Sequence, residues 1–395
     1  MKRWLCVVAL LLAAGSGWAQ VTVVKGAGQK TSIDWSAFQS TDGIGQLFTR
    51  VLTDDLQRSG WFVRGGPGQA ELALTGQAGQ GGVQAIVYSR MAQRQVYGKR
   101  YPMNPQEVRR LAHRVADEII EAVTGKKGIA SGRIALVGNR TGKKEIYLMD
   151  ADGHGLQQLT RDNNVSITPN WGPGGRQLVY TSYLKGFPDI FLIEMASGAR
   201  QRIAYYSGLN TGGAISPDGR EMAMILSKDG NPELYVRDLR GGALTRLTQT
   251  LRSAEASPSW SPDGRQIVYV SDQAGSPQLY VMSRSGGNPR RLTTRGSQNV
   301  APDWGRNNVI AYASLFGGRW NVSIIDPMGG ESRQVTPGDA DYEDPSWAPD
   351  GRHLVAGRAI RYASKVVLLD TMGDPPLVLT DYSGDWTSPA WAPSP

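Results

Sequence analysis

The sequence has 395 residues, a length that favours two domains, and its 49 glycines, 22 prolines and 40% hydrophobic residues suit a turn-rich β protein. The formal charge is +8, but the 43 basic residues are scattered rather than clustered, which argues against a nucleic-acid-binding function. A mildly basic surface of this kind suits solvent, or an acidic partner in the cell envelope.

The first 19 residues have the parts of a cleaved secretory signal peptide. Two basic residues precede the apolar stretch 4–14, and small residues lead to an expected cleavage between Ala19 and Gln20. The apolar stretch is well short of the roughly 20 residues needed to cross a bilayer. Cleavage would also remove Cys6, the single cysteine, so no disulfide is expected. We therefore expect an exported, soluble protein without a transmembrane segment.

Residues 20–128 have the pattern of a small α/β domain. Apolar residues recur at helical spacing between Ile44 and Leu56, and Gly60 follows where such a helix would end. Three further runs predict strands, at 70–76, 83–89 and 94–99. The domain is therefore expected to pack helices on a sheet.

A second helix in this domain is predicted from its capping residues. Asn104, Pro105 and Glu107 have the spacing of an N-cap, a first-turn proline and a capping-box partner. The apolar stripe that follows, 108–123, is nearly unbroken and predicts a helix with one face in the core. The segment 125–132 is predicted to link this domain to the rest of the chain.

From residue 129 onward the sequence repeats with a period of about 44 residues. A Trp, or once an Ile, recurs at that step: Trp171, Ile215, Trp260, Trp304, Trp347 and Trp391. Pairs of the Leu-Thr type follow the same period, starting at Leu159, Ile203, Leu247, Leu292, Val335 and Leu379. Such a period, with short strand-like runs in each unit, is typical of a β-propeller and not of a helical solenoid.

Each repeat is predicted to form one four-stranded blade whose first strand is innermost along the channel. After Trp260, residues Pro262, Asp263 and Gly264 have the preferences of a tight turn between the first two strands. A third strand is predicted in every repeat, at 146–149, 190–193, 234–237, 279–282, 322–325 and 366–369. We interpret the Trp and Pro-Asp-Gly residues as architecture rather than as a site.

The two ends of the repeat array complement each other. The segment 131–150 has a second and a third strand without a preceding Trp motif, whereas 388–395 has the Trp motif with no strands after it. We therefore expect six blades, one of them assembled from both chain ends. The predicted architecture is an N-terminal α/β domain, 20–128, followed by an all-β six-bladed propeller of WSPDG-type repeats, 129–395.

A catalytic site would need a nucleophile, a base or clustered metal ligands. The three histidines, His113, His154 and His353, lie too far apart in the sequence to suggest a shared site, and no G-x-S-x-G motif is present. No catalytic, cofactor or metal site is therefore predicted. Carboxylates that precede the Trp motifs could bind a cation such as calcium at the channel mouth: Glu255, Asp303, Glu343, Asp344 and Asp385.

Two other functions stay open on these residues. One is a propeller enzyme of the lactonase or sugar-lyase type with a metal in the channel. The other is a scaffold that binds cell-wall glycan through its basic charge.

Together these features resemble the TolB family, the periplasmic components of the Tol-Pal cell-envelope system. The strings that carry the resemblance are LTDDLQRSGWF at 52–62, LSKDGNPELYVRDL at 226–239, SDQAGSPQLY at 271–280, GSQN at 296–299 and PAWAP at 389–393. It extends over essentially the whole chain after the signal. The sequence departs from the repeat motif at Ile215 and at 305–308, where Gly-Arg-Asn-Asn replaces Ser-Pro-Asp-Gly.

The resemblance implies a binding protein, not an enzyme, that supports outer-membrane integrity and envelope constriction during cell division. TolB-like proteins bind the peptidoglycan-associated lipoprotein Pal on the propeller face whose loops enter the innermost strands. These loops would be 208–213, 253–257, 297–302 and 341–345. The implied Pal contacts are Leu209, Asn210, Thr211, Gly212, Ala256, Ser257, Asn299, Val300, Glu343 and Asp344.

The resemblance further implies that TolA binds the N-terminal arm, Gln20, Val21, Thr22, Val23 and Val24. An alternating β-prone arm can add as a strand to a partner's sheet, or pair within its own domain. Other outer-membrane or cell-wall proteins could be further partners, and a monomer is expected.

Overall fold

The computed structural model describes residues 29–361 and 363–393. Its first part is one mixed sheet with strand order β3-β1-β4-β5-β6, and β2 pairs with β4. The strands are β1 (Thr31–Asp34), β2 (Phe38–Ser40), β3 (Phe62–Arg64), β4 (Leu72–Gly79), β5 (Gly82–Ser89) and β6 (Arg94–Tyr101). The three predicted strands correspond to β4, β5 and β6. The short strands β1, β2 and β3 were not predicted.

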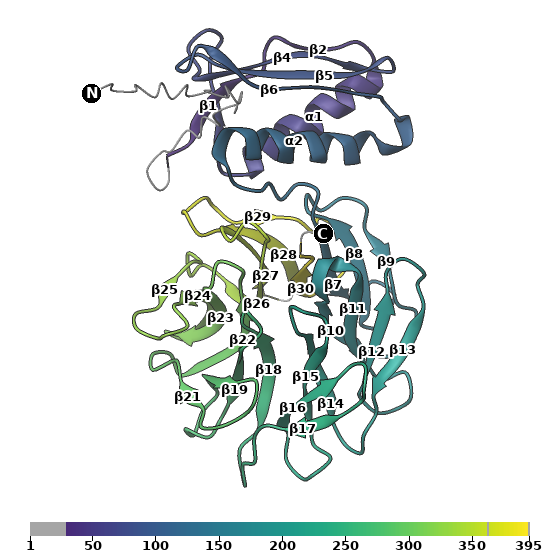
Figure 1. Cartoon of the computed structure of the whole chain (residues 1–395), viewed down its shortest axis with the longest axis vertical. Coiled ribbons are helices and arrows are strands. Elements are labelled where there is room, and N and C mark those ends of the chain that lie inside the picture. Colours follow the sequence, from purple (N-terminus) through teal and green to yellow (C-terminus); the bar gives the residue numbers. More distant parts are fainter. Residues whose placement is uncertain (1–28, 362, 394–395) are drawn as a thin grey trace, which may run out of the picture.

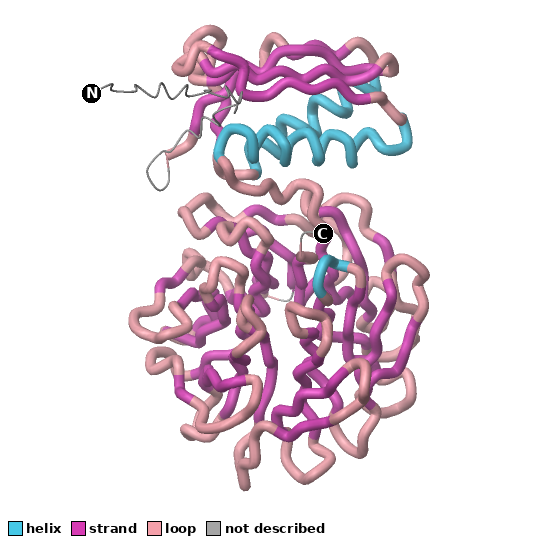
Figure 2. The backbone as a smooth tube through the Cα atoms, viewed as in Figure 1, coloured by secondary structure: helices cyan, strands magenta, loops and turns pink. Residues whose placement is uncertain are grey.

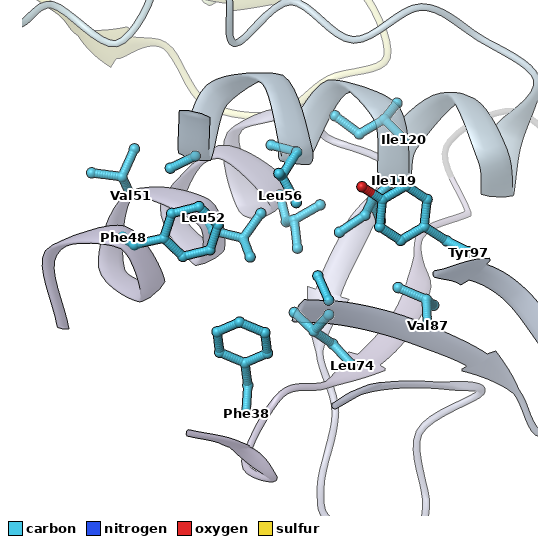
Figure 3. Packing of buried hydrophobic residues seen from close by; sticks show 14 of the residues in the cluster. Phe38, Phe48, Val51, Leu52, Leu56, Leu74, Val87, Tyr97, Ile119 and Ile120 are labelled. Atoms are coloured by element: carbon cyan, nitrogen blue, oxygen red, sulfur yellow. The ribbon is translucent and has the colours of Figure 1, made fainter. Parts of the chain in front are cut away.

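Two helices, α1 (Gly43–Arg58) and α2 (Val108–Thr124), cover one face of this sheet. The predicted helical stripes form its core, which Figure 3 shows with Phe48 and Leu52 of α1 facing Phe38, and Ile119 of α2 near Tyr97. Figures 1 and 2 show both helices lying between the sheet and the propeller. The helices therefore face the second domain.

The helix ends differ in part from the prediction. Gly125 ends α2 in the left-handed conformation, with φ +69°, as expected of a C-terminal glycine. The predicted capping box does not form, because Asn104 instead caps a short 3-10 turn, η1 (Pro105–Glu107), by accepting from the Gln106 N–H at 3.1 Å. The Glu107 carboxylate pairs with Arg110 at 2.7 Å. The proline is thus tolerated in η1, one turn before the α-helix.

The second part is six four-stranded antiparallel sheets arranged as the blades of a propeller (Figure 1). The inner strands are β10 (Ser166–Trp171), β14 (Asn210–Ile215), β18 (Glu255–Trp260), β22 (Gln298–Trp304), β26 (Asp341–Trp347) and β30 (Trp386–Trp391). The second strands are β7 (Arg133–Gly138), β11 (Gln177–Ser182), β15 (Glu221–Leu226), β19 (Gln266–Ser271), β23 (Ile310–Phe316) and β27 (His353–Ile360).

The outer half of each blade holds the third and fourth strands. The third strands are β8 (Glu145–Asp150), β12 (Asp189–Glu194), β16 (Glu233–Asp238), β20 (Gln278–Ser283), β24 (Arg319–Ile325) and β28 (Ala363–Asp370). The fourth strands are β9 (Gln157–Gln158), β13 (Arg200–Ala204), β17 (Leu244–Arg246), β21 (Arg290–Arg291), β25 (Arg333–Gln334) and β29 (Leu377–Val378). All six predicted third strands are present.

The two repeat markers have different structural functions. The Trp residues and Ile215 end the inner strands, and all are buried between blades. Five of the six Leu-Thr-type pairs have a threonine, Ala204 being the exception, and this threonine holds the third strand. For example, Thr248 Oγ1 accepts from the Leu234 N–H at 2.9 Å and Thr380 Oγ1 from the Val366 N–H at 2.8 Å. At the departure 305–308, Asn308 takes the left-handed position with φ +57° and accepts from the Trp304 indole at 3.0 Å.

One blade combines strands from both ends of the propeller, in the order β30-β7-β8-β9. Strand β30 pairs antiparallel with β7, and Trp386 lies opposite Gly138. The Trp386 side chain is 0% exposed and packs edge-on against Tyr147, with ring centroids 5.0 Å apart. A Cβ at Gly138 would overlap the Trp386 ring, so glycine leaves the space that the indole fills.

The predicted linker packs against both domains. Ala130 packs in the core of the α/β domain, whereas Ile129 packs in the blade that contains β30. Asp117 of α2 accepts hydrogen bonds from the N–H groups of Ala130 and Ser131, at 2.8 and 2.9 Å. These contacts fix the chain where the domains meet.

No helix within the described ranges, 29–361 and 363–393, combines the length and the apolar character needed to cross a membrane.

Candidate functional site

Every inner strand contains the same irregularity, a β-bulge three residues before its last residue. At each bulge one residue has φ between +46° and +65°: Thr168, Gly212, Ser257, Ala301, Asp344 and Ser388. A proline follows in five of the six strands, and Gly213 in the other. Non-glycine residues seldom adopt this conformation, and bulges are typically found where a strand re-aims its side chains. The six bulges, one in each blade, therefore fix the backbone conformation of the channel wall.

The bulge residues and the prolines after them line a cavity of about 190 Å³. A second cavity of about 480 Å³ is lined by the tryptophans at the other ends of the inner strands. Both share the wall residues Asn170, Ser259, Asp303, Ser346 and Ala390, so they form one channel. We call the propeller face at the bulge residues the bulge face, and the face at the Trp ends and Pro-Asp-Gly turns the turn face.

Two carboxylates belong to the channel wall. Asp303 accepts from the Trp347 N–H at 2.7 Å, and burial raises its pKa to about 6, against hydrogen bonds that favour the ionised form. Asp344 accepts from the Ser388 hydroxyl at 2.7 Å, and burial raises its pKa as well. Partly desolvated carboxylates would gain from a counter-charge. The channel cation stays a prediction.

The other three carboxylates expected at the channel mouth are placed differently. Glu255 is buried inside its blade, where it accepts from the Ser271 hydroxyl at 2.9 Å and burial raises its pKa to about 7. Asp385 accepts from the Asn139 side chain at 2.9 Å. The expectation is therefore wrong for Glu255, whereas Asp385 is simply not among the residues that line the channel cavities. Glu343 is exposed but is not among the residues that line the channel cavities.

The segments expected as loops at this face lie largely within the inner strands, because each strand begins before its bulge. Asn210 and Asn299 are 0% exposed and hydrogen-bond to nearby backbone carbonyls, at 2.8 Å to Tyr206 and 2.8 Å to Arg295 respectively. They are corrected from contact residues to structural ones. The remaining candidates are at least partly accessible: Leu209, Thr211, Gly212, Ala256, Ser257, Val300, Glu343 and Asp344.

Exposed apolar side chains on the bulge face were missed in the sequence. Phe187 is 73% exposed in the loop between β11 and β12, and Leu251 is 98% exposed in the loop before β18. Phe316 and Ile360, at the ends of the second strands β23 and β27, are exposed at the same face. Apolar residues in loops rich in Gly and Lys, as in YLKGFPD at 183–189, were the available signal. Exposed apolar surface can mark an interaction site, and these four side chains are the candidates for one at the bulge face.

The histidines do not follow the expectation that they lie too far apart to share a site. His113 and His154 both approach Asp152, whose Oδ2 is 3.8 Å from His113 Nε2 and 3.3 Å from His154 Nδ1. His353 contacts Asp350 through Nδ1 at 2.6 Å. Within the described residues no histidine lines the channel, so the alternative of a channel-metal enzyme gains no support from these positions.

Residues 120–395, more than half of the chain, match the family model described as the TolB beta propeller domain. The chain belongs to the TolB family. It is 34% identical over 366 residues to the Tol-Pal system protein TolB of Gluconobacter oxydans (strain 621H), covering 87% of this chain and 80% of that protein. The Tol-Pal system protein TolB of Bordetella pertussis (strain Tohama I / ATCC BAA-589 / NCTC 13251) is 30% identical over 231 residues, 51% of this chain and 53% of the relative.

A solved structure extends the TolB likeness to the N-terminal domain. The crystal structure of TolB from Acinetobacter baumannii superposes with a TM-score of 0.82 at 27% identity, covering 92% of this chain and 97% of that one. The resemblance read from the sequence, the α/β domain and the six-bladed propeller are thereby confirmed. Both of these relatives are named as Tol-Pal system proteins. The chain is accordingly a component of the Tol-Pal system.

Proposed function

We propose that this chain is a periplasmic protein that binds Pal through the bulge face of the propeller and TolA through its N-terminal arm. The observation that carries the proposal is the bulge face itself: a hollow ring of fixed backbone, surrounded by exposed apolar side chains. Family membership supports the choice of partners. Binding at these two places would support outer-membrane integrity and constriction of the envelope during division.

The bulge face has the mixture of apolar and charged side chains expected of a protein interface. Protein interfaces place apolar anchors near the centre and polar groups at the rim. Here Phe187 and Leu251 supply apolar surface, while Lys144, Lys185 and Arg252 are exposed on the same set of loops. The inner-strand backbone is held by the blades, so little ordering would be required on binding. A partner with apolar anchors and an acidic rim would fit this surface.

Replacing Phe187 by alanine, or adding bulk with Ala256→Val, should weaken Pal binding by about thirtyfold, roughly 2 kcal/mol, through lost contact or lost shape complementarity. Ala256 is exposed on β18 and has ordinary strand pairing with Val270. Gly212→Val is a poorer test, because φ +65° at Gly212 would strain any larger side chain. Titration calorimetry with purified Pal measures the change.

The matched control is Met328→Ala. Met328 is 81% exposed but lies on the turn face, after β24, so its truncation should leave Pal affinity at the wild-type value. All variants should keep the wild-type melting temperature. Wild-type affinity in both Phe187→Ala and Ala256→Val would show that Pal docks elsewhere.

The proposed TolA-binding arm, Gln20 to Val24, and the signal cleavage site between Ala19 and Gln20 lie outside the described residues. Deleting 20–24 from the mature chain should abolish TolA binding, because the strand that would add to the TolA sheet is gone. Pal binding should be unchanged. Calorimetric titration with each partner separately tests both statements, and retained TolA affinity would assign TolA to another surface.

A further inference from the structure

The α/β domain meets the turn face of the propeller at several charged contacts. The contacts are Lys30 Nζ to Asp374 at 2.6 Å, Arg352 to the Gly60 carbonyl at 3.0 Å, and an ion pair between Arg109 and Asp152. In each case the propeller group lies in or beside a turn that joins two strands. Polar contacts of this kind can be made and broken without unfolding either domain.

His113 lies at the centre of one of these contacts. It belongs to α2, and its side chain is only 4% exposed. Nδ1 is 2.6 Å from Asp55 of α1, in the same domain. Nε2 faces Asp152, in the turn between β8 and β9 of the propeller, at 3.8 Å, and has no hydrogen-bond partner among the described residues. One imidazole thus lies between a carboxylate of its own domain and one of the other domain.

The charges around this imidazole are nearly balanced without it. Arg58 is 3.4 Å from Asp55, and Arg109 pairs with Asp152, so each carboxylate already has a guanidinium. The elements around His113 also carry Arg50 and Asp54 of α1, Arg110, Arg114, Asp117 and Glu118 of α2, and Glu107, Arg133, Asp150 and His154 nearby. A divalent cation would place two further charges in an already neutralised cluster. A single proton on His113 adds one charge, which both carboxylates attract.

We propose that protonation of His113 fastens the α/β domain to the turn face of the propeller, so that the two domains dock more tightly as the pH falls. The imidazolium would hold Asp55 through Nδ1 and attract Asp152 through Nε2–H. The neutral ring keeps the first contact and loses the second.

The direction of the titration agrees with this arrangement. Burial alone would lower the pKa of His113, but the hydrogen bond to Asp55 and the charges of Asp55 and Asp152 outweigh burial and raise it. Burial also raises the pKa of Asp55. The pKa of Asp152 is lowered, against burial, by the His154 N–H and by Arg109, so Asp152 stays ionised. The stabilisation is therefore complete below the ordinary histidine pKa and is lost as the pH rises through the raised pKa of His113.

Amide hydrogen exchange of Ala130 and Ser131 in the full chain tests the proposal, because their N–H groups are held by Asp117 at the domain junction. His113→Asn keeps a donor for Asp55 but cannot titrate. Comparing wild type with His113→Asn at each pH removes the intrinsic pH dependence of exchange. The protection of the wild type over the variant should be largest near pH 6 and fall as the pH rises through the raised pKa of His113. One coupled proton limits the change to about tenfold per pH unit.

Asp152→Asn removes the propeller carboxylate without touching the histidine, and should lose the same pH response. His154→Asn, on the exposed side of Asp152, should keep it. A wild-type to His113→Asn ratio that does not vary between pH 6 and 9 would overturn the proposal, as would a full response in Asp152→Asn. Stronger protection on adding equimolar Zn²⁺ at constant pH, with no response to pH, would assign the cluster to a metal instead.

Discussion

Replacing Trp386 by alanine should lower the free energy of unfolding of the propeller by about 3–5 kcal/mol, the usual cost of removing a buried Trp side chain from a core. The indole fills the space left by Gly138 and contacts Tyr147, so its loss leaves a cavity where β30 joins β7. Because β30 is held in its blade by β7 alone, we expect the loss to loosen the closing blade first. Chemical denaturation followed by tryptophan fluorescence and circular dichroism measures the change.

Leu251→Ala is the control for this variant. Leu251 is 98% exposed, and its truncation should change the unfolding free energy by less than about 0.5 kcal/mol. If Trp386→Ala costs no more than this control, the closing blade does not depend on the Trp386 packing.

Arg352→Ala should be similarly destabilising, by about 3–5 kcal/mol near pH 7, because it leaves the buried Asp370 carboxylate without its partner. Arg352 donates to both oxygens of Asp370, at 3.0 and 2.7 Å, and its guanidinium lies 4.5 Å from the centre of the Trp61 ring. It also donates to the Gly60 carbonyl across the domain boundary. We therefore expect the variant to melt in two separate calorimetric transitions and the wild type to unfold with its two domains coupled.

The stability that the Arg352–Asp370 pair contributes should change with pH in a definite direction. Burial would raise the pKa of Asp370, but the hydrogen bonds from Arg352 and the Met372 N–H hold it below its usual range. The pair thus contributes stability above the ordinary aspartate pKa and loses it as the pH falls through the lowered value. The difference between wild type and Arg352→Ala should shrink on acidification. Arg352→Lys, which keeps the charge without the fork of donors, should be intermediate. A difference under 1 kcal/mol at pH 7 would contradict the account.

The propeller could be predicted from the sequence because its repeated residues are required by the local backbone conformation. Gly264 ends a Pro-Asp-Gly turn with φ +68°, and Trp260 ends a short inner strand, so both recur wherever the local structure recurs. The bulges also have a sequence signal, because a proline precedes the Trp by two positions in five repeats. The positive φ of Ser257 or Asp344 could not be read, because these residue types rarely adopt it.

Contacts between segments distant in the chain were beyond the sequence. His113 and Asp152 are brought together only by the docking of two domains, and nothing in either local sequence indicates the partner. The complementarity of Gly138 and Trp386 depends likewise on strand pairing between the two ends of the propeller. The residues proposed for the binding face lie at the starts of the inner strands, as the repeat predicted, but the burial of Asn210 and the exposure of Phe187 follow from how the loops fold over the blades.

The blade shared between β30 and β7 also has a meaning for the order of folding. During synthesis β7 emerges long before β30, so its inner edge stays without a partner until the last strand of the propeller is available. An unpaired strand edge is a template for association with other chains. The nascent chain can therefore associate wrongly through this edge during most of its synthesis. The edge is covered only when β30 has been made and pairs with β7. A chaperone that covers the edge of β7 would act in that interval.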